Sequence, residues 1–177
     1  MAAGPGRADV PRAGVSSQVP LIQPSPLGDP PRLPILARTL GLAGLLPQGA
    51  VVTALVFGDT DVRFTALSVG YAYAALIFSF LGGLWWGLAA MGGERTPGWA
   101  WGAAVAPSLL ALATAWPWAT GGTWPGPSLV VLGVAIAASL LVDLRLKALG
   151  ITPGGWLALR APLSLGLGGL TVAAGLL

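Results

Sequence analysis

The sequence predicts an all-α membrane protein, a polytopic bundle of five transmembrane helices. Hydrophobic residues make up 55% of the chain and charged residues only 8%, whereas a soluble domain carries roughly a quarter charged residues. Five apolar segments each reach the length of about 20 residues that a helix needs to cross a hydrocarbon core of about 30 Å. Barrel strands would be about half as long and would alternate in polarity.

Glycine- and proline-rich loops mark the ends of each predicted element. Residues 1–32 contain seven prolines and few apolar runs, so they are predicted to form a disordered cytoplasmic tail that cannot offset its chain entropy by burial. The transmembrane domain then occupies residues 33–177. Its helices are predicted at about 34–57, 65–90, 99–119, 127–149 and 156–177. Polar loops such as residues 58–63 connect them.

The basic residues predict how the chain is threaded. With the N-terminus inside, the inner side collects eight of the nine basic residues: Arg7, Arg12, Arg32, Arg38, Arg95, Arg145, Lys147 and Arg160. Only Arg63 lies outside. The positive-inside rule therefore predicts a cytoplasmic N-terminus and, with five spans, a periplasmic C-terminus. The eight tryptophans fall near the predicted helix ends, which is typical of interfacial aromatic belts: Trp85, Trp86, Trp99, Trp101 and Trp156 inside, Trp116, Trp118 and Trp124 outside.

Composition argues against several functions. The chain has no cysteine and no histidine, which excludes disulfides, thiol chemistry and imidazole metal ligands. No phosphate-binding loop or nucleophile motif is present. The basic residues do not cluster with aromatic residues on a soluble face, so no nucleic acid is expected as a partner. We expect no catalytic, cofactor or metal residues, and the lipid bilayer as the main surrounding partner.

One face of the second predicted helix carries small residues. Ala75, Ser79, Gly83 and Gly87 recur every four positions, and Gly83 with Gly87 forms a GxxxG pattern. Such faces let helix backbones approach closely in a membrane. The pattern predicts either a packing seam against another helix of this chain or the face of a homodimer.

Two prolines lie near the middle of predicted helices. Pro47 and Pro107 each remove a backbone donor and are expected to kink the first and third spans. Gln48 and Ser108 are polar neighbours. Broken helices of this kind build midplane sites in many transporters, but no ionisable residue lies at that depth. Kinks without a site are therefore the alternative.

Asp143 and Arg160 are charges inside predicted spans. They lie 8.5 positions before and after the midpoint between Ile151 and Thr152, the centre of the hairpin that the last two spans form. Antiparallel helices then place them at one depth, about 13 Å along each helix from the turn at 1.5 Å per residue. The spacing predicts an intramembrane ion pair. The alternative is that Asp143 bonds Lys147 while Arg160 extends toward the interface.

Three blocks of the sequence resemble one family. They are residues 40–47, residues 73–87 with Ser-Phe-Leu-Gly-Gly followed by Trp-Gly, and Asp143 through Ser164. Together they resemble the domain-of-unknown-function family 3429 (DUF3429), small polytopic bacterial inner-membrane proteins with eukaryotic mitochondrial relatives. Trp85 stands where the family often has His or Arg, and Gln48 where Phe is usual. The resemblance implies the topology and a bacterial inner-membrane location, with the mitochondrial inner membrane as the alternative. It implies no activity.

Two functions are consistent with these features. The first is a non-catalytic helical bundle that acts as partner or assembly component of a membrane complex, and the protein is therefore not expected to be an enzyme. The alternative is a small transporter or channel component with a midplane site near Pro47/Gln48 and Pro107/Ser108.

Overall fold

The computed structural model describes residues 34–177. The predicted disordered tail, residues 1–32, lies outside the described residues. Within residues 34–177 the chain forms helices and no strand: α1 (Ile35–Ala43), α2 (Leu46–Phe57), α3 (Thr60–Gly92), a short 3-10 helix (Gly93–Arg95), α4 (Gly98–Ala119), α5 (Gly126–Ala138), α6 (Leu140–Ala148) and α7 (Trp156–Leu176).

These helices make five runs that are long and apolar enough to cross a membrane: Ile35–Phe57, Thr60–Arg95, Gly98–Ala119, Gly126–Ala148 and Trp156–Leu176. The predicted all-α bundle of five spanning helices is confirmed. Its orientation stays a prediction. The main difference lies at the predicted loop 58–63. That loop is shorter, because α3 begins at Thr60 and Asp59 caps it, with Oδ1 accepting from the Val62 amide at 3.2 Å.

The first span is broken where a kink was predicted. α1 ends at Ala43, and α2 begins at Leu46 with Pro47 in its first turn, where the missing amide proton costs no helical bond. The Tyr73 hydroxyl donates to the Gly44 carbonyl at 2.6 Å and so satisfies a backbone acceptor at the break. Pro107, by contrast, lies inside the uninterrupted α4.

The fourth span has an interruption that the sequence did not predict. α5 ends at Ala138 and α6 begins at Leu140. The hydroxyl of Ser139 donates to the Ile136 carbonyl at 2.6 Å, which offers the backbone a local alternative to the regular helical bond. The break lies one turn before Asp143.

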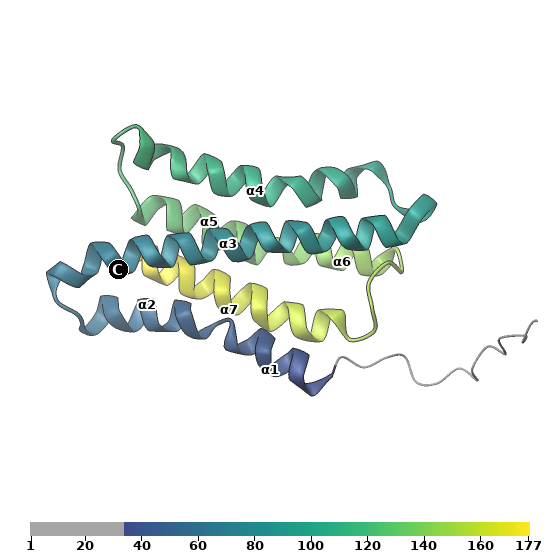
Figure 1. The fold of residues 1–177 in the computed structure, drawn as a ribbon, viewed down its shortest axis with the longest axis horizontal. Coiled ribbons are helices and arrows are strands. Elements are labelled where there is room, and N and C mark those ends of the chain that lie inside the picture. Colours follow the sequence, from purple (N-terminus) through teal and green to yellow (C-terminus); the bar gives the residue numbers. More distant parts are fainter. Residues whose placement is uncertain (1–33) are drawn as a thin grey trace, which may run out of the picture.

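The helices run side by side along the long axis of the molecule, as Figure 1 shows. α3 packs mainly against α4 and α2, while α5 packs against α7. In this view α4 and α2 lie on opposite sides of α3. Buried apolar side chains such as Phe78, Leu81, Leu129, Leu132 and Leu167 fill the space between these helices.

Glycines bring α5 and α7 into backbone contact. A Cβ on Gly133 would lie 2.7 Å from the carbonyl oxygen of Gly168, and a Cβ on Gly168 would lie 2.7 Å from that of Gly133. Neither position therefore has room for a side chain. Close backbone approach of this kind drives helix association in a membrane, where lipid competes for ordinary apolar contacts.

The predicted small-residue seam on α3 does not form within residues 34–177. Gly83 and Gly87 are exposed, and a Cβ at either would meet nothing within 4 Å. The glycine that packs is Gly82, where a Cβ would overlap the Ala104 carbonyl of α4 and lie 3.3 Å from Cγ of Pro107. One residue is about 100° around a helix, so Gly82 and Gly83 face different directions. The intramolecular seam is a wrong prediction for Gly83 and Gly87. Ala75 and Ser79 are half-buried.

Candidate functional site

The two charges predicted to pair lie together inside the bundle. Asp143 on α6 is completely buried, and Arg160 at the start of α7 is nearly so. Nε of Arg160 donates to Oδ2 of Asp143 at 3.0 Å. The contact uses only the Nε donor of the guanidinium group, so it is monodentate rather than bidentate. The alternative partner, Lys147, forms no ion pair with Asp143 in the described part of the chain.

Two tryptophans complete the surroundings of Asp143. The indole N–H groups of Trp85 on α3 and Trp156 on α7 both donate to Oδ1, each at 2.9 Å. Trp85 is only 3% exposed, so the aromatic-belt interpretation is wrong for this residue. Its side chain lies in the bundle because a buried carboxylate needs donors. Three helices, α3, α6 and α7, therefore meet at one carboxyl group.

Two serines extend the cluster along α7. Nη2 of Arg160 donates to Oγ of Ser164 at 2.9 Å, and Ser164 lies 3.4 Å from the hydroxyl of Ser139 at the α5–α6 break. Trp156, Arg160 and Ser164 recur every four residues, so they share one face of α7. This spacing was visible in the sequence, and it is the signal that would have added Trp156 and Ser164 to the predicted pair.

The arrangement stabilises charge rather than exposing it. Asp143 accepts one bond from a cation and two from indoles, so both carboxylate oxygens are in use. A buried charge is tolerated when it is paired and hydrogen-bonded. The carboxylate is thus committed to contacts within the bundle and is not positioned toward open space. The Arg160 guanidinium, unlike the carboxylate, also faces open space, because Arg160 lines a cavity.

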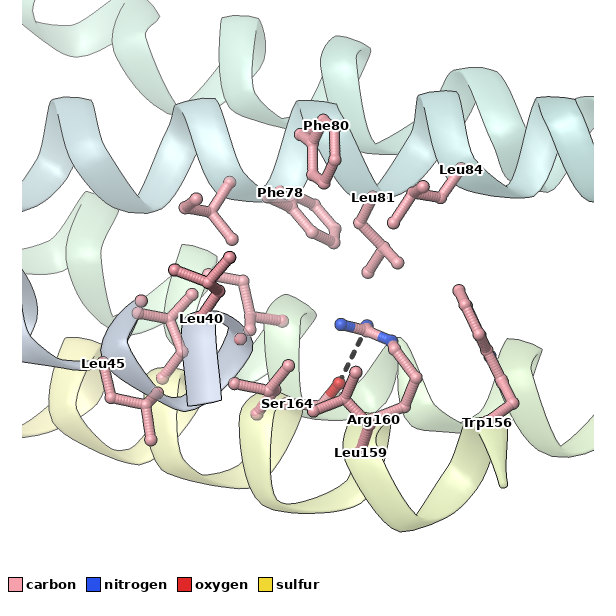
Figure 2. Close-up of a pocket in the computed structure, with 16 residues that line it drawn as sticks. Leu40, Leu45, Phe78, Phe80, Leu81, Leu84, Trp156, Leu159, Arg160 and Ser164 are labelled. Carbon is pink, nitrogen blue, oxygen red and sulfur yellow. Dashed lines mark hydrogen bonds between the residues drawn. The ribbon is translucent and has the colours of Figure 1, made fainter. Parts of the chain in front are cut away.

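The cavity has a volume of about 300 Å³ and lies between α1, α3 and α7. Figure 2 shows the Arg160 guanidinium extending from α7 into this space, with its bond to Ser164. Arg160 and Ser164 provide the polar part of the lining. Apolar residues provide the rest, among them Leu40, Leu45, Phe78, Leu81, Leu84, Leu159, Leu163 and Leu167.

The residues considered for a midplane site lie apart. Gln48 on α2 is completely buried against α3, where a Cβ on Gly70 would lie 3.5 Å from its Nε2. Both amide atoms of Gln48 lack a hydrogen-bond partner among residues 34–177. Ser108 on α4 is exposed, and α4 lies on the other side of α3 (Figure 1). The structure does not bring Gln48 and Ser108 together.

Metal ligands of the usual kinds are not grouped in the part of the chain that the structure describes. Among residues 34–177 there is no set of three or more histidine, cysteine, aspartate or glutamate side chains that could hold an ion. Besides the Asp143 cluster, the buried polar side chains in this part of the chain include Gln48, Ser128 and Thr171.

Five apolar spans around a buried carboxylate cluster define a polytopic α-helical membrane protein. The family described as "Protein of unknown function (DUF3429)" matches residues 33–176, and the chain belongs to that family. No curated protein and no solved structure matches the chain. Trp85, one of the two positions at which the sequence was expected to depart from the family, is one of the two indole donors to Asp143.

Proposed function

We propose that this protein is a non-catalytic membrane bundle that acts as a partner or assembly component of a larger membrane complex. The observation that carries the proposal is that the carboxylate of Asp143 is fully engaged in hydrogen bonds within the bundle. This carboxylate is the only acidic side chain buried within residues 34–177, and its two oxygens accept three bonds from this chain. The group best suited to acid–base chemistry is therefore occupied by structural contacts.

The exterior of α3 supports the same proposal. Gly83 and Gly87 leave a strip of backbone without side chains on the outside of the bundle. Beside it, the rings of Trp86 and Trp101 pack edge to face with centroids 4.9 Å apart. Small residues next to an aromatic pair offer another helix close approach and a large contact area.

We propose the bacterial inner membrane as the location, with the mitochondrial inner membrane as the alternative.

Site-specific photocrosslinking tests this proposal. A photoreactive residue at Gly83 should give one discrete crosslinked product in membranes, whereas the same residue at Val134, which is exposed on α5, should give none. A product of twice the chain mass would indicate a second copy, and any other discrete mass a different partner. No product at Gly83, or the same products at Val134, would contradict a partner at this face.

A small transporter or channel component is the second candidate, and Gln48 favours it. A buried amide without partners costs about 1–3 kcal/mol, and contact with a passing solute or water would satisfy the two amide atoms of Gln48. Gln48→Leu would then abolish flux in liposomes while raising the unfolding free energy. If no solute flux distinguishes the Gln48→Leu variant from the parent protein, the transporter candidate is lost.

A further inference from the structure

Arg160 has donors that the protein does not use. A guanidinium group carries five N–H donors. One, on Nε, goes to Asp143, and one, on Nη2, goes to Ser164. The remaining three have no acceptor among residues 34–177, and Nη1 makes no bond at all there. Because Arg160 lines the cavity, its free donors face that space (Figure 2).

The cavity is lined on α7 from Trp156 to Leu167, and its one charged side chain, Arg160, lies nearer the Trp156 end. Arg160 is the fifth residue of α7, and the lining continues along that helix to Leu167. Seven residues of helix correspond to about 10 Å. Over this distance the opposite wall is formed by apolar residues of α3, from Leu84 to Ile77, and by Leu40 and Leu45. The occupant therefore needs an acceptor at one end and a hydrocarbon body.

The charge of the cluster selects the kind of acceptor. Asp143 and Arg160 neutralise each other at 3.0 Å. An anionic group on the free side of Arg160 would leave a net negative charge in apolar surroundings, which is costly. An uncharged oxygen would accept from the guanidinium and leave the cluster neutral. An uncharged carbonyl oxygen is thus the best fit.

The cavity is open toward the bilayer. Leu40 on α1 and Phe80 on α3 both line it, yet they are 65% and 64% exposed. In a membrane-spanning bundle these side chains meet lipid, so an occupant enters between α1 and α3 without crossing water. Arg160 lies near the beginning of α7, and from it the longer, mainly apolar part of the cavity runs toward the middle of the span. A membrane lipid has the same order, with ester groups near the interface and chains toward the midplane.

We propose that this cavity binds one acyl chain of a glycerolipid, whose ester carbonyl oxygen accepts a hydrogen bond from the free donors of Arg160. The site depends on residence in a membrane and not on the proposed role in a complex. It would hold α1, which packs against α7 more than against α3, to the rest of the bundle through the lipid chain.

Two lipids that differ only at the carbonyl test the bond. The purified full chain is loaded with diacyl phosphatidylcholine or with its dialkyl ether analogue, which lacks the ester carbonyls, and bound lipid is counted by native mass spectrometry. One diacyl lipid should be retained, and the ether analogue should bind about tenfold more weakly, as expected for loss of a bond to a charged donor. Equal retention of the two lipids would overturn the proposal.

Two substitutions locate the site. Leu163→Trp adds volume inside the cavity, whereas Leu165→Trp on the same helix faces outward. Leu163→Trp should abolish retention of the diacyl lipid and Leu165→Trp should preserve it. If both variants retain lipid equally, the lipid is bound elsewhere and the proposal fails. The neutral double variant Asp143→Asn/Arg160→Met, which has no side-chain donor at position 160, should bind the diacyl and ether lipids alike, and a remaining preference for the diacyl lipid would overturn the bond to Arg160.

Competition tests the charge argument. Methyl oleate, which is uncharged, should displace the bound diacyl lipid at lower concentration than oleate, which is anionic. A preference for oleate would show that the cavity selects an acid and would overturn the uncharged carbonyl as the ligand. Failure of the partner crosslinks at Gly83 would leave these outcomes unchanged, so the two proposals are separable.

Discussion

Oδ2 of Asp143 lies 3.0 Å from Nε of Arg160, although the two residues are 17 positions apart and belong to different helices. Equal distance from the hairpin midpoint places them at one depth. For the two side chains to face each other, α6 and α7 must also be rotated so that Asp143 and Arg160 point toward one another. The indole N–H groups of Trp85 and Trp156 hold the carboxylate in place by donating to its other oxygen, Oδ1.

Removal of the Arg160 cation alone should lower the unfolding free energy more than removal of both charges, those of Asp143 and Arg160. Arg160→Ala strands a buried carboxylate and should lower the unfolding free energy by about 3–5 kcal/mol. Asp143→Asn/Arg160→Gln leaves neutral groups and should cost less. A double-mutant cycle with Asp143→Asn, Arg160→Gln and the double variant, measured by unfolding in detergent, gives the coupling. A coupling near zero would mean that the contact does not stabilise the bundle.

Each indole donor should contribute separately. Trp85→Phe or Trp156→Phe keeps an aromatic ring but removes one donor to Asp143, and each should lower the unfolding free energy by about 1–3 kcal/mol. Trp116→Phe is the matched control, because Trp116 is exposed on α4. Similar losses for all three would show that the hydrogen bond to Asp143 is not responsible.

Neighbouring glycines of α3 should behave differently. Gly82→Ala places a methyl group against the Ala104 carbonyl and should lower the unfolding free energy by about 1–3 kcal/mol. Gly83→Leu should leave the unfolding free energy of the monomer nearly unchanged, because nothing within the described chain lies near it, and should weaken crosslinking to the proposed partner. If Gly83→Leu destabilises the monomer as much as Gly82→Ala, the described packing of α3 is incorrect.

The α5–α7 contact should tolerate no added methyl group. Gly133→Ala puts a Cβ 2.7 Å from the Gly168 carbonyl oxygen and should lower the thermal unfolding midpoint in detergent, with a cost of about 1–3 kcal/mol. Gly169→Ala, on α7 next to Gly168 but with open space around it, should leave the midpoint unchanged or slightly raise it, because alanine favours helix. Equal effects would indicate a general influence of helix propensity.

The distribution of basic residues predicts the threading. With eight of nine on one side, a reporter fused after Leu177 should be periplasmic and one fused at Gly93 cytoplasmic. Activity of a cytoplasmic reporter after Leu177 would show that the bundle is inserted the other way or that the number of spans is not five.

The sequence by itself determined the five spans, because hydropathy over about 20 residues is a local property that the bilayer reads directly. It also determined the equal depth of Asp143 and Arg160, since a hairpin converts sequence spacing into depth. The loop at residues 58–63 was predicted too long because Asp59 caps α3 from inside that stretch.

Only the tertiary structure decided which faces meet. A shift of one residue turns a side chain about 100° around its helix, and nothing local distinguishes the buried Gly82 from the exposed Gly83. Trp85 reaches Asp143 across 58 positions of sequence, so its role depends on how α3 packs against α6 and α7. The cavity beside Arg160 likewise depends on how α1, α3 and α7 pack together, which the sequence of no single helix determines.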